Sequence, residues 1–209
     1  MQTKIGGKNR VGRDSDVVLP GVLFILSGPS GVGKNTIAVR LLSTVGSENL
    51  KKVVTITTRP PRVFERDGID YHFVSWEKFA EGIRQSEFLE YANVHGGAYY
   101  GSPRTDVENI LSSGANALLL IDTAGVAQIL SRKNNFRTAT VFVAPKSLDD
   151  LRERIIGRGT ETKAAIAQRI KTAENEVKMA KIYDHVVVSG SRDEDFAAVL
   201  KIYQMETQN

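Results

Sequence analysis

An apolar strand, a glycine-rich turn and a helix follow one another near the start of this 209-residue chain. The run Val22–Leu26 is continuously apolar and contains β-branched residues, which is typical of a strand buried in a parallel sheet. A cluster of glycines and a proline breaks the strand after Ser27. Apolar residues then recur at helical spacing from Ile37 to Leu42. This order predicts an α/β fold in which the turn joins a central strand to a helix.

The turn has the pattern G-x-x-x-x-G-K from Gly28 to Lys34, which is that of a phosphate-binding P-loop. Glycines let the backbone wrap closely around phosphate oxygens, and the N-terminus of the next helix attracts the same anion. Lys34 adds a positive charge for the β- and γ-phosphates of a nucleotide. We prefer this interpretation to a simple glycine turn because the strand and the helix on either side match the context of the motif.

One position departs from the motif, because Asn35 follows Lys34 where the pattern has Ser or Thr. The hydroxyl group at this place normally binds Mg²⁺. An amide oxygen is also a hard ligand and could bind the ion or one of its waters, but the side chain is longer. Thr36 is rotated by about 100° around the helix, so it is a poor substitute. We expect Mg²⁺ as a cofactor, with Asn35 as its candidate protein ligand.

The composition narrows the class of protein. Of all residues, 41% are hydrophobic and 25% charged, as in an ordinary globular protein, and no cysteine is present to form a disulfide or a thiolate metal site. We find no apolar run that could cross a bilayer and no signal-peptide core, so we expect a cytoplasmic protein without membrane contact. The net charge of +4 has no accompanying basic stripe with aromatic residues, so we expect no nucleic-acid partner.

Three regions are predicted along the chain. Residues 1–20 are polar, basic and without apolar periodicity, which predicts a flexible tail. Residues 21–209 alternate strands with helices and form one domain, in which Val53–Thr57 is expected to be the second strand. Short strands with tight turns between about 57 and 102 predict a small mixed β insertion. The apolar run Ala117–Ile121 predicts a buried strand that delivers Asp122 to the ligand-binding edge of the sheet.

Several separate segments resemble guanylate kinases in their order and spacing, over about Gly21 to Tyr203. These segments are Gly28–Lys34, Thr57–Arg62, Asp70–Tyr71, Phe88–Glu90, Tyr99–Ser102, Ile121–Asp122 and Gly157–Thr162. Members of this family transfer a phosphoryl group from ATP to GMP. The resemblance implies a P-loop three-layer sandwich with a parallel sheet core, a GMP-binding insertion at about 57–102 and a helical lid at about 152–172.

The resemblance also implies three sets of site residues. The GMP site would consist of Thr55, Arg59, Arg62, Tyr71, Glu90, Tyr100, Gly101, Ser102 and Asp122. The ATP phosphates would bind to Gly28, Pro29, Ser30, Gly31, Val32, Gly33, Lys34, Asn35 and Thr36. The catalytic residues would be Lys34, Arg59, Arg154, Arg158 and Arg169, the last three in or beside the lid. The partners implied are the small molecules GMP and ATP, bound by a monomer or a homodimer.

Residue chemistry supports these roles independently. Arg59 and Arg62 lie within four positions and can form a forked clamp for a phosphate dianion, which tyrosine hydroxyls strengthen. The carboxylate of Glu90 can accept the N1–H and N2–H groups of guanine together, and adenine does not offer this pair. Arginines over the phosphates suit a transition state with charge on the phosphoryl oxygens. No general base is needed, because the GMP phosphate is already a nucleophile.

The sequence differs from the family pattern beyond Asn35. Val63-Phe64 replaces the usual Pro-Gly, and Leu120 replaces the usual first Asp before Ile-Asp. Thr123-Ala124 replaces an aromatic residue or Met followed by Gln. Ser189-Gly190 replaces the usual Asn-Asp beside adenine. Asn35 and Leu120 together indicate altered metal binding.

Two other functions stay open. A guanylate-kinase-like scaffold domain would bind phosphorylated peptides without catalysis, but such domains usually lose the glycine loop and the lysine that this chain keeps. A kinase for another nucleotide, such as AMP or a deoxynucleotide, is disfavoured by Glu90 and Thr55.

Overall fold

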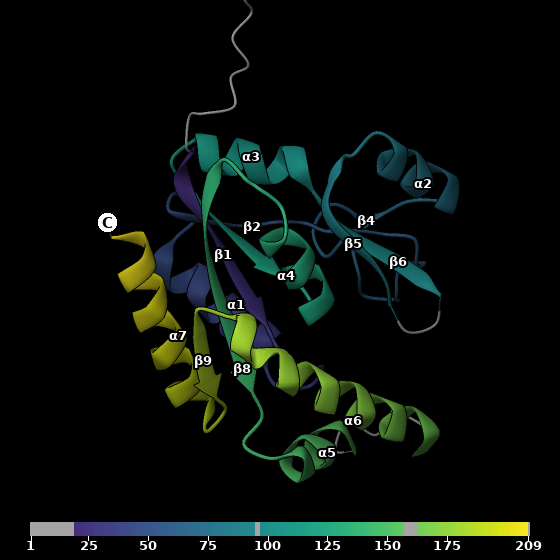
Figure 1. Cartoon of the computed structure of the whole chain (residues 1–209), viewed down its shortest axis with the longest axis vertical. Helices are drawn as coiled ribbons and strands as arrows, with labels where there is room; N and C mark the ends of the chain where they lie inside the picture. Colours follow the sequence, from purple (N-terminus) through teal and green to yellow (C-terminus); the bar gives the residue numbers. More distant parts are fainter. Residues whose placement is uncertain (1–18, 95–96, 157–162, 209) are drawn as a thin grey trace, which may run out of the picture.

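A parallel sheet forms the centre of the computed structural model, which describes residues 19–94, 97–156 and 163–208 (Figure 1). Its strands lie in the order β2-β7-β1-β8-β9, with the bounds β1 Leu19–Ser27, β2 Leu50–Lys52, β7 Asn116–Leu120, β8 Phe136–Ala144 and β9 His185–Val188. In the central strand β1, Leu26 is in register with Leu120 on one side and Val141 on the other. The glycine-rich turn after β1 therefore lies at the middle of the carboxyl edge of the sheet, where open α/β sheets bind ligands.

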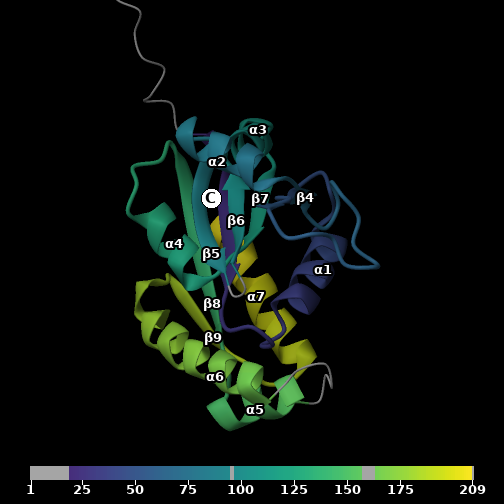
Figure 2. The ribbon, with the colours of Figure 1, turned by 90° about the vertical axis from the view of Figure 1, so that its right-hand side faces the viewer.

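Helices cover both faces of the sheet (Figures 1 and 2). The apolar core on one face includes residues of α1 (Lys34–Val45) and α7 (Arg192–Thr207), and the core on the other includes residues of α3 (Arg104–Ser112) and α4 (Thr123–Leu130). Side chains of β1 alternate between these two cores, because successive residues of a strand point to opposite faces. This arrangement confirms the predicted three-layer α/β sandwich.

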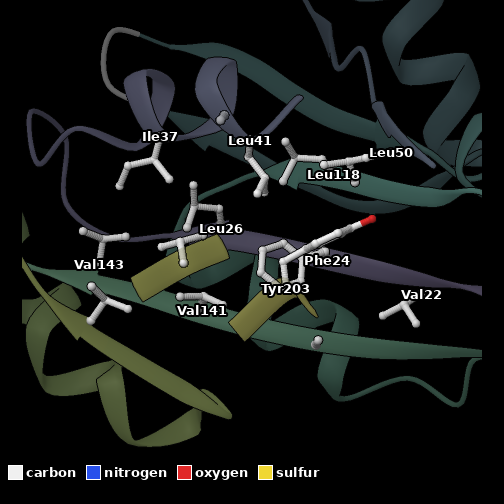
Figure 3. Close-up of a cluster of buried hydrophobic side chains, with 14 of the residues drawn as sticks. Val22, Phe24, Leu26, Ile37, Leu41, Leu50, Leu118, Val141, Val143 and Tyr203 are labelled. Carbon is white, nitrogen blue, oxygen red and sulfur yellow. The ribbon is translucent and has the colours of Figure 1, made fainter. Parts of the chain in front are cut away.

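The core beside α1 and α7 extends along the sheet from Ile37 and Val143, near the glycine loop, to Val22 and Tyr203 (Figure 3). The rings of Tyr203 and Phe24 meet edge to face with their centroids 5.4 Å apart. The Tyr203 hydroxyl accepts a hydrogen bond from Asn116 Nδ2 at 2.9 Å, and Asn116 Oδ1 accepts one from Val22 N at 2.9 Å. Burying each such large side chain stabilises the fold by about 1.5–3 kcal/mol, so β1 and β7 form a rigid base for the loops that follow them.

A second, smaller sheet lies beside the first and has mixed strand directions, as predicted for the insertion. Its order is β4-β3-β6-β5, with the bounds β3 Ile56–Thr57, β4 His72–Phe73, β5 Phe88–Val94 and β6 Ala98–Pro103. Strands β3 and β4 are parallel, and the other pairs are antiparallel. Helix α2 (Trp76–Arg84) packs its Phe79 ring on Phe88 of β5, with the ring centroids 4.6 Å apart.

The predicted strand Val53–Thr57 is wrong, because this run passes from one sheet to the other. Val53 is still tied to the large sheet, where its N–H donates to the carbonyl oxygen of Leu118 at 2.9 Å. The carbonyl oxygen of Thr55 already accepts from His72 N at 2.9 Å, beside the small sheet. The β-branched residues of the run are continuous, so local sequence does not mark where the chain changes sheets.

The predicted tail is two residues too long. Leu19 and Pro20 belong to β1, and residues 1–18 lie outside the described part of the chain. Leu19 N donates to Asn135 O at 2.8 Å, and the pairing with β8 then shifts between Leu19 and Val22. Pro20 has no N–H to donate, so it is tolerated at this irregular position of the strand.

Two helices form the lower right of Figure 1 and correspond to the predicted lid: α5 (Leu148–Ile156) and α6 (Lys163–Lys178), which continues into the 3₁₀ helix η1 (Met179–Ile182). Leu151, Ile155 and Ala173 form their own buried cluster, distinct from the two cores of the large sheet. Within the described ranges, no helix has both the length and the apolar character needed to cross a membrane.

Candidate active site

Glycines shape the loop between β1 and α1. Gly28, Gly31 and Gly33 have φ angles of 138°, 95° and 115°, which side chains of L-residues rarely allow. A Cβ on Gly28 would lie 2.3 Å from the carbonyl oxygen of Val143, and one on Gly31 would lie 3.3 Å from Ile155 Cγ1 of α5. The loop thus packs closely against β8 and α5.

The start of α1 is suited to an anion. The N-cap residue Gly33 has no side chain to accept from the first N–H groups, and the first turn contains no acidic residue. The ammonium group of Lys34 folds back over the loop and donates to the carbonyl oxygens of Gly28 and Pro29. These features place a cation and helical N–H donors around one loop.

The remaining P-loop and lid residues are placed as follows. Asn35 and Thr36 are exposed in the first turn of α1. Arg169 of α6 reaches the loop, where its Nη1 donates to Ser30 Oγ in a long hydrogen bond of 3.4 Å. Arg154 belongs to α5, and Arg158 lies outside the described residues.

A buried carboxylate lies at the meeting point of the two sheets. Glu90 of β5 is 4% exposed, and its Oε1 accepts a hydrogen bond from the buried Ser102 Oγ at 2.5 Å. The pKa of Glu90 is raised to about 7. Burial is the main cause, the hydrogen bond from Ser102 opposes the rise, and the negative charge of Asp122 adds to it. Such a group can accept two hydrogen bonds from a planar ligand in a site from which water is largely excluded.

The start of α4 forms the other side of this carboxylate site. Asp122 follows β7 as the N-cap of α4, and its Oδ1 accepts from Gly125 N at 2.9 Å. A Cβ on Gly125 would lie 2.7 Å from Glu90 Oε2. Gln128 holds β5 against α4, because its side chain exchanges hydrogen bonds with both backbone groups of Tyr91. The geometry brings Glu90, Ser102 and Asp122 together.

Arg59 after β3, Tyr71 directly before β4 and Tyr100 of β6 also come together. Arg59 Nε donates to the Tyr100 hydroxyl at 3.0 Å, and the guanidinium lies 5.4 Å from the centre of the Tyr71 ring. The rings of the two tyrosines meet edge to face at 5.7 Å. Arg62 is exposed, and its guanidinium makes no hydrogen bond or ion pair with another residue of the described ranges.

Thr55 and Gly101 are two further predicted members of the GMP site. The Thr55 hydroxyl makes no hydrogen bond to any residue that the structure describes, although the residue lies at the junction of the sheets. Gly101 packs against an aromatic side chain, since a Cβ there would lie 2.7 Å from Phe88 Cδ1. Gly101 therefore lies in the aromatic core between the small sheet and α2.

Sequence reasoning missed three residues of this region. Glu65 forms an ion pair with Arg59, and Gly125 makes room for Glu90. Glu176 of α6 is partly buried, which raises its pKa, while the nearby Lys34 lowers it and Asp122 raises it. The signal for Glu65 is its position three residues after Arg62, but nothing in the sequence marks Gly125 or Glu176, because their neighbours are distant along the chain.

Comparison with known proteins gives consistent matches. The family model described as guanylate kinase matches residues 21–206. A guanylate kinase of Clostridioides difficile (strain 630) is 43% identical over 170 residues, covering 81% of this chain and 80% of that protein. A guanylate kinase of Histophilus somni (strain 129Pt) is 37% identical over 186 residues, covering 89% and 88%.

A solved structure agrees with the sequence matches. The crystal structure of guanylate kinase from Anaplasma phagocytophilum superposes with a TM-score of 0.73 at 30% identity, covering 93% of this chain and 90% of that one. The resemblance that the motifs indicated is thereby confirmed over nearly the whole domain: the chain belongs to the guanylate kinase family.

Proposed function

We propose that this chain is an ATP:GMP phosphotransferase, which moves the γ-phosphoryl group of ATP to GMP and releases ADP and GDP in purine nucleotide metabolism. Family membership supports the reaction. The observation that carries the choice of acceptor is the buried carboxylate of Glu90, held by Ser102 beside Asp122. Only a base that presents adjacent N–H donors, as guanine does, fits a carboxylate of this kind.

The phosphate groups are assigned to the two basic regions. The loop Gly28–Thr36 binds the ATP phosphates, with Lys34 on the β- and γ-phosphates. Arg169, together with Arg154 and Arg158 of the same segment, stabilises the charge that spreads over the transferred phosphoryl group. Arg62, Tyr71 and Tyr100 bind the GMP phosphate. The region 57–102 thus acts as the GMP-binding insertion and 152–172 as the lid.

The described side chains could supply only part of the oxygen ligands that Mg²⁺ takes. Within the described ranges, no group of three His, Asp or Glu side chains could hold a metal ion. Asn35 offers an exposed amide oxygen one residue after Lys34, and Mg²⁺ takes oxygen ligands while keeping several waters. We propose that Asn35 and the ATP phosphates hold the ion, which neutralises phosphate charge when bound. Leu120, where the family usually has Asp, is packed against the core beside α1.

A coupled assay of ADP formation tests the function. GMP, AMP, CMP and UMP are offered in parallel, and GMP alone should be phosphorylated efficiently. Glu90→Gln places an amide donor against the guanine donors and should cost about 2–5 kcal/mol in kcat/KM for GMP. Glu87→Gln changes an exposed carboxylate nearby and serves as the matched control.

The assay also separates the alternatives. GMP binding without GDP formation, across a range of Mg²⁺ and Mn²⁺ concentrations, would favour the scaffold domain. Faster turnover of AMP or a pyrimidine nucleotide would favour another nucleotide kinase. We propose a cytoplasmic location, where ATP and GMP are available, and either a monomer or a homodimer, which sedimentation would distinguish.

A further inference from the structure

The loop that carries Arg59 and Arg62 is closed into a ring by Glu65. Glu65 Oε2 accepts from Arg59 Nη1 at 2.8 Å and from the backbone N–H of Arg62 at 2.8 Å. Glu65 Oε1 accepts from Arg59 Nη2 at 2.9 Å, and Glu65 N donates to Arg62 O at 3.0 Å. One carboxylate therefore fixes the guanidinium of one arginine and the backbone of the other.

The ion pair between Arg59 and Glu65 is mostly buried and stays ionised. The side chains of Arg59 and Glu65 are 18% and 17% exposed, in contrast with Val63 and Phe64 between them on the sequence, which are 91% and 94% exposed. The hydrogen bond from Arg59 lowers the pKa of Glu65 to about 2, so the carboxylate stays ionised at neutral pH. A bidentate arginine–carboxylate pair in such surroundings has a well-defined geometry.

Most donors of Arg59 are already used. An arginine has five N–H groups. Arg59 spends one from Nε on the Tyr100 hydroxyl, two from Nη1 on Pro60 O and Glu65 Oε2, and one from Nη2 on Glu65 Oε1. A phosphate can therefore take one N–H of Nη2 from this arginine unless it displaces Glu65.

The arrangement prepares the neighbouring tyrosine for a phosphate. Because the oxygen of Tyr100 accepts from Arg59 Nε, its own hydrogen is directed elsewhere and can be donated to an anion. The Arg59–Glu65 pair is neutral as a unit, so the net positive charge of the loop comes from Arg62, which is exposed.

We propose that Glu65 is a positioning residue for the GMP phosphate: it locks Arg59 as the support of Tyr100 and sets the backbone of Arg62, the arginine that meets the phosphate with its full charge. This inference rests on the proposed function, because it names a determinant of the same acceptor site. It gives Arg59 and Arg62 different tasks, although the sequence presents them as one clamp.

The test compares GMP with guanosine, which lacks the phosphate. Both oxygens of Glu65 are acceptors, and Glu65→Gln keeps only one of them. The Arg59 guanidinium therefore loses at least one acceptor, and the Arg62 N–H loses its own when the amide nitrogen takes the place of Oε2. We expect GMP affinity by calorimetry to fall by about tenfold or more, as for a lost charge-assisted hydrogen bond, with guanosine affinity unchanged. In steady-state kinetics, KM for GMP should rise while KM for ATP stays the same.

Two further variants separate positioning from folding. Glu81→Gln removes another Glu–Arg ion pair of the same small domain, with Arg84, and should leave GMP affinity unchanged. If Glu65 acts through Arg59, the double variant Arg59→Lys/Glu65→Gln should lose far less than the product of the two single losses.

Three results would overturn the inference. Tighter GMP binding by Glu65→Gln would mean that Glu65 competes with the phosphate. Equal losses for GMP and guanosine would mean that it merely maintains the fold, and no change would mean that Arg59 needs no support. If the unaltered protein binds GMP but makes no GDP, the proposed function fails while this binding comparison remains decisive for Glu65.

Discussion

Glu90 Oε2 would lie 2.7 Å from a Cβ atom on Gly125, so β5 of the small sheet and the start of α4 approach each other in a way that only glycine permits. The two residues are 35 positions apart and belong to different parts of the fold. Ser102 contacts the other oxygen of the same carboxylate. The lack of a side chain at Gly125 and the hydroxyl of Ser102 thus set the position of the Glu90 carboxylate, the candidate group for recognising the base.

Gly125→Ala should therefore weaken GMP binding. Gly125 lies within α4 and its φ is not positive, so alanine should be neutral or should stabilise the helix by about 0.5–1 kcal/mol. Its methyl group would push the Glu90 carboxylate away from its place. We expect a higher KM for GMP and an unchanged KM for ATP. The melting temperature should fall only slightly, because the gain in helix propensity offsets part of the cost of displacing the buried carboxylate. Ala124→Ser on the exposed side of α4 is the control. A normal KM for GMP would show that Glu90 tolerates the shift.

Burial of Glu90 should make stability depend on pH. Its pKa is raised from 4.5 to about 7, so the folded protein binds one more proton than the unfolded chain between these values. The free energy of unfolding should then fall as pH rises from about 4.5 to 7, by about 3 kcal/mol in total. Urea unfolding of the protein and of Glu90→Gln at pH 5 and pH 8 measures this. The free energy of unfolding of Glu90→Gln, relative to that of the unaltered protein, should be higher at pH 8 than at pH 5.

The same titration should control recognition of the base. The ionised carboxylate accepts both guanine donors, so affinity should rise with pH through about 7. Guanosine is the better ligand for this measurement, because the phosphate of GMP itself titrates near pH 6. A flat profile for guanosine between pH 5.5 and 8.5 would remove Glu90 from contact with the base.

The parts of the site that sequence predicts well are those that local order determines. The segment from Gly28 to Lys34 must follow a strand and begin a helix, and both conditions are visible in the residues themselves. The start of α5 also depends on neighbouring residues alone, because Ser147 Oγ accepts a hydrogen bond from Asp150 N, three residues later, at 3.0 Å. Strand and helix order therefore follows from periodicity, and so does the three-layer arrangement.

The parts that sequence misses depend on contacts between distant elements. Val53–Thr57 has one continuous β pattern, yet its two ends pair with different sheets. Arg59 and Arg62 look equivalent along the chain, and the difference between them comes from the conformation of a loop that returns Glu65 to Arg59. Gly125 has no signal at all, because its importance lies in the space that Glu90 occupies.

Arg169→Ala should lower turnover far more than it lowers GMP affinity. Arg169 extends from helix α6 to Ser30 of the glycine loop, beside the expected position of the ATP phosphates. A cation there stabilises charge that develops during transfer, so its loss should reduce kcat by about 10²-fold with little change in KM for GMP. Lys171→Ala, an exposed cation of the same helix, is the matched control. Parallel losses in kcat and in GMP affinity would assign Arg169 to ground-state binding.

Asn35→Ser should reduce the Mg²⁺ concentration needed for half-maximal rate. Asn35 occupies the second position of α1, directly after Lys34, and its exposed side chain is accessible to an ion. Mg²⁺ demands short metal–oxygen distances in near-octahedral geometry, and a serine hydroxyl meets this demand better than a longer amide. Leu120 gives no carboxylate to compensate, since it packs against the core beside α1.

Rates at fixed ATP over a Mg²⁺ titration, and again with Mn²⁺, measure the effect. Asn35→Ala, which removes the oxygen altogether, should need the most Mg²⁺, and the larger Mn²⁺ should narrow the gap between the asparagine and serine forms. An identical Mg²⁺ dependence for the asparagine, serine and alanine forms would mean that residue 35 does not touch the ion, and that phosphates and water hold it alone.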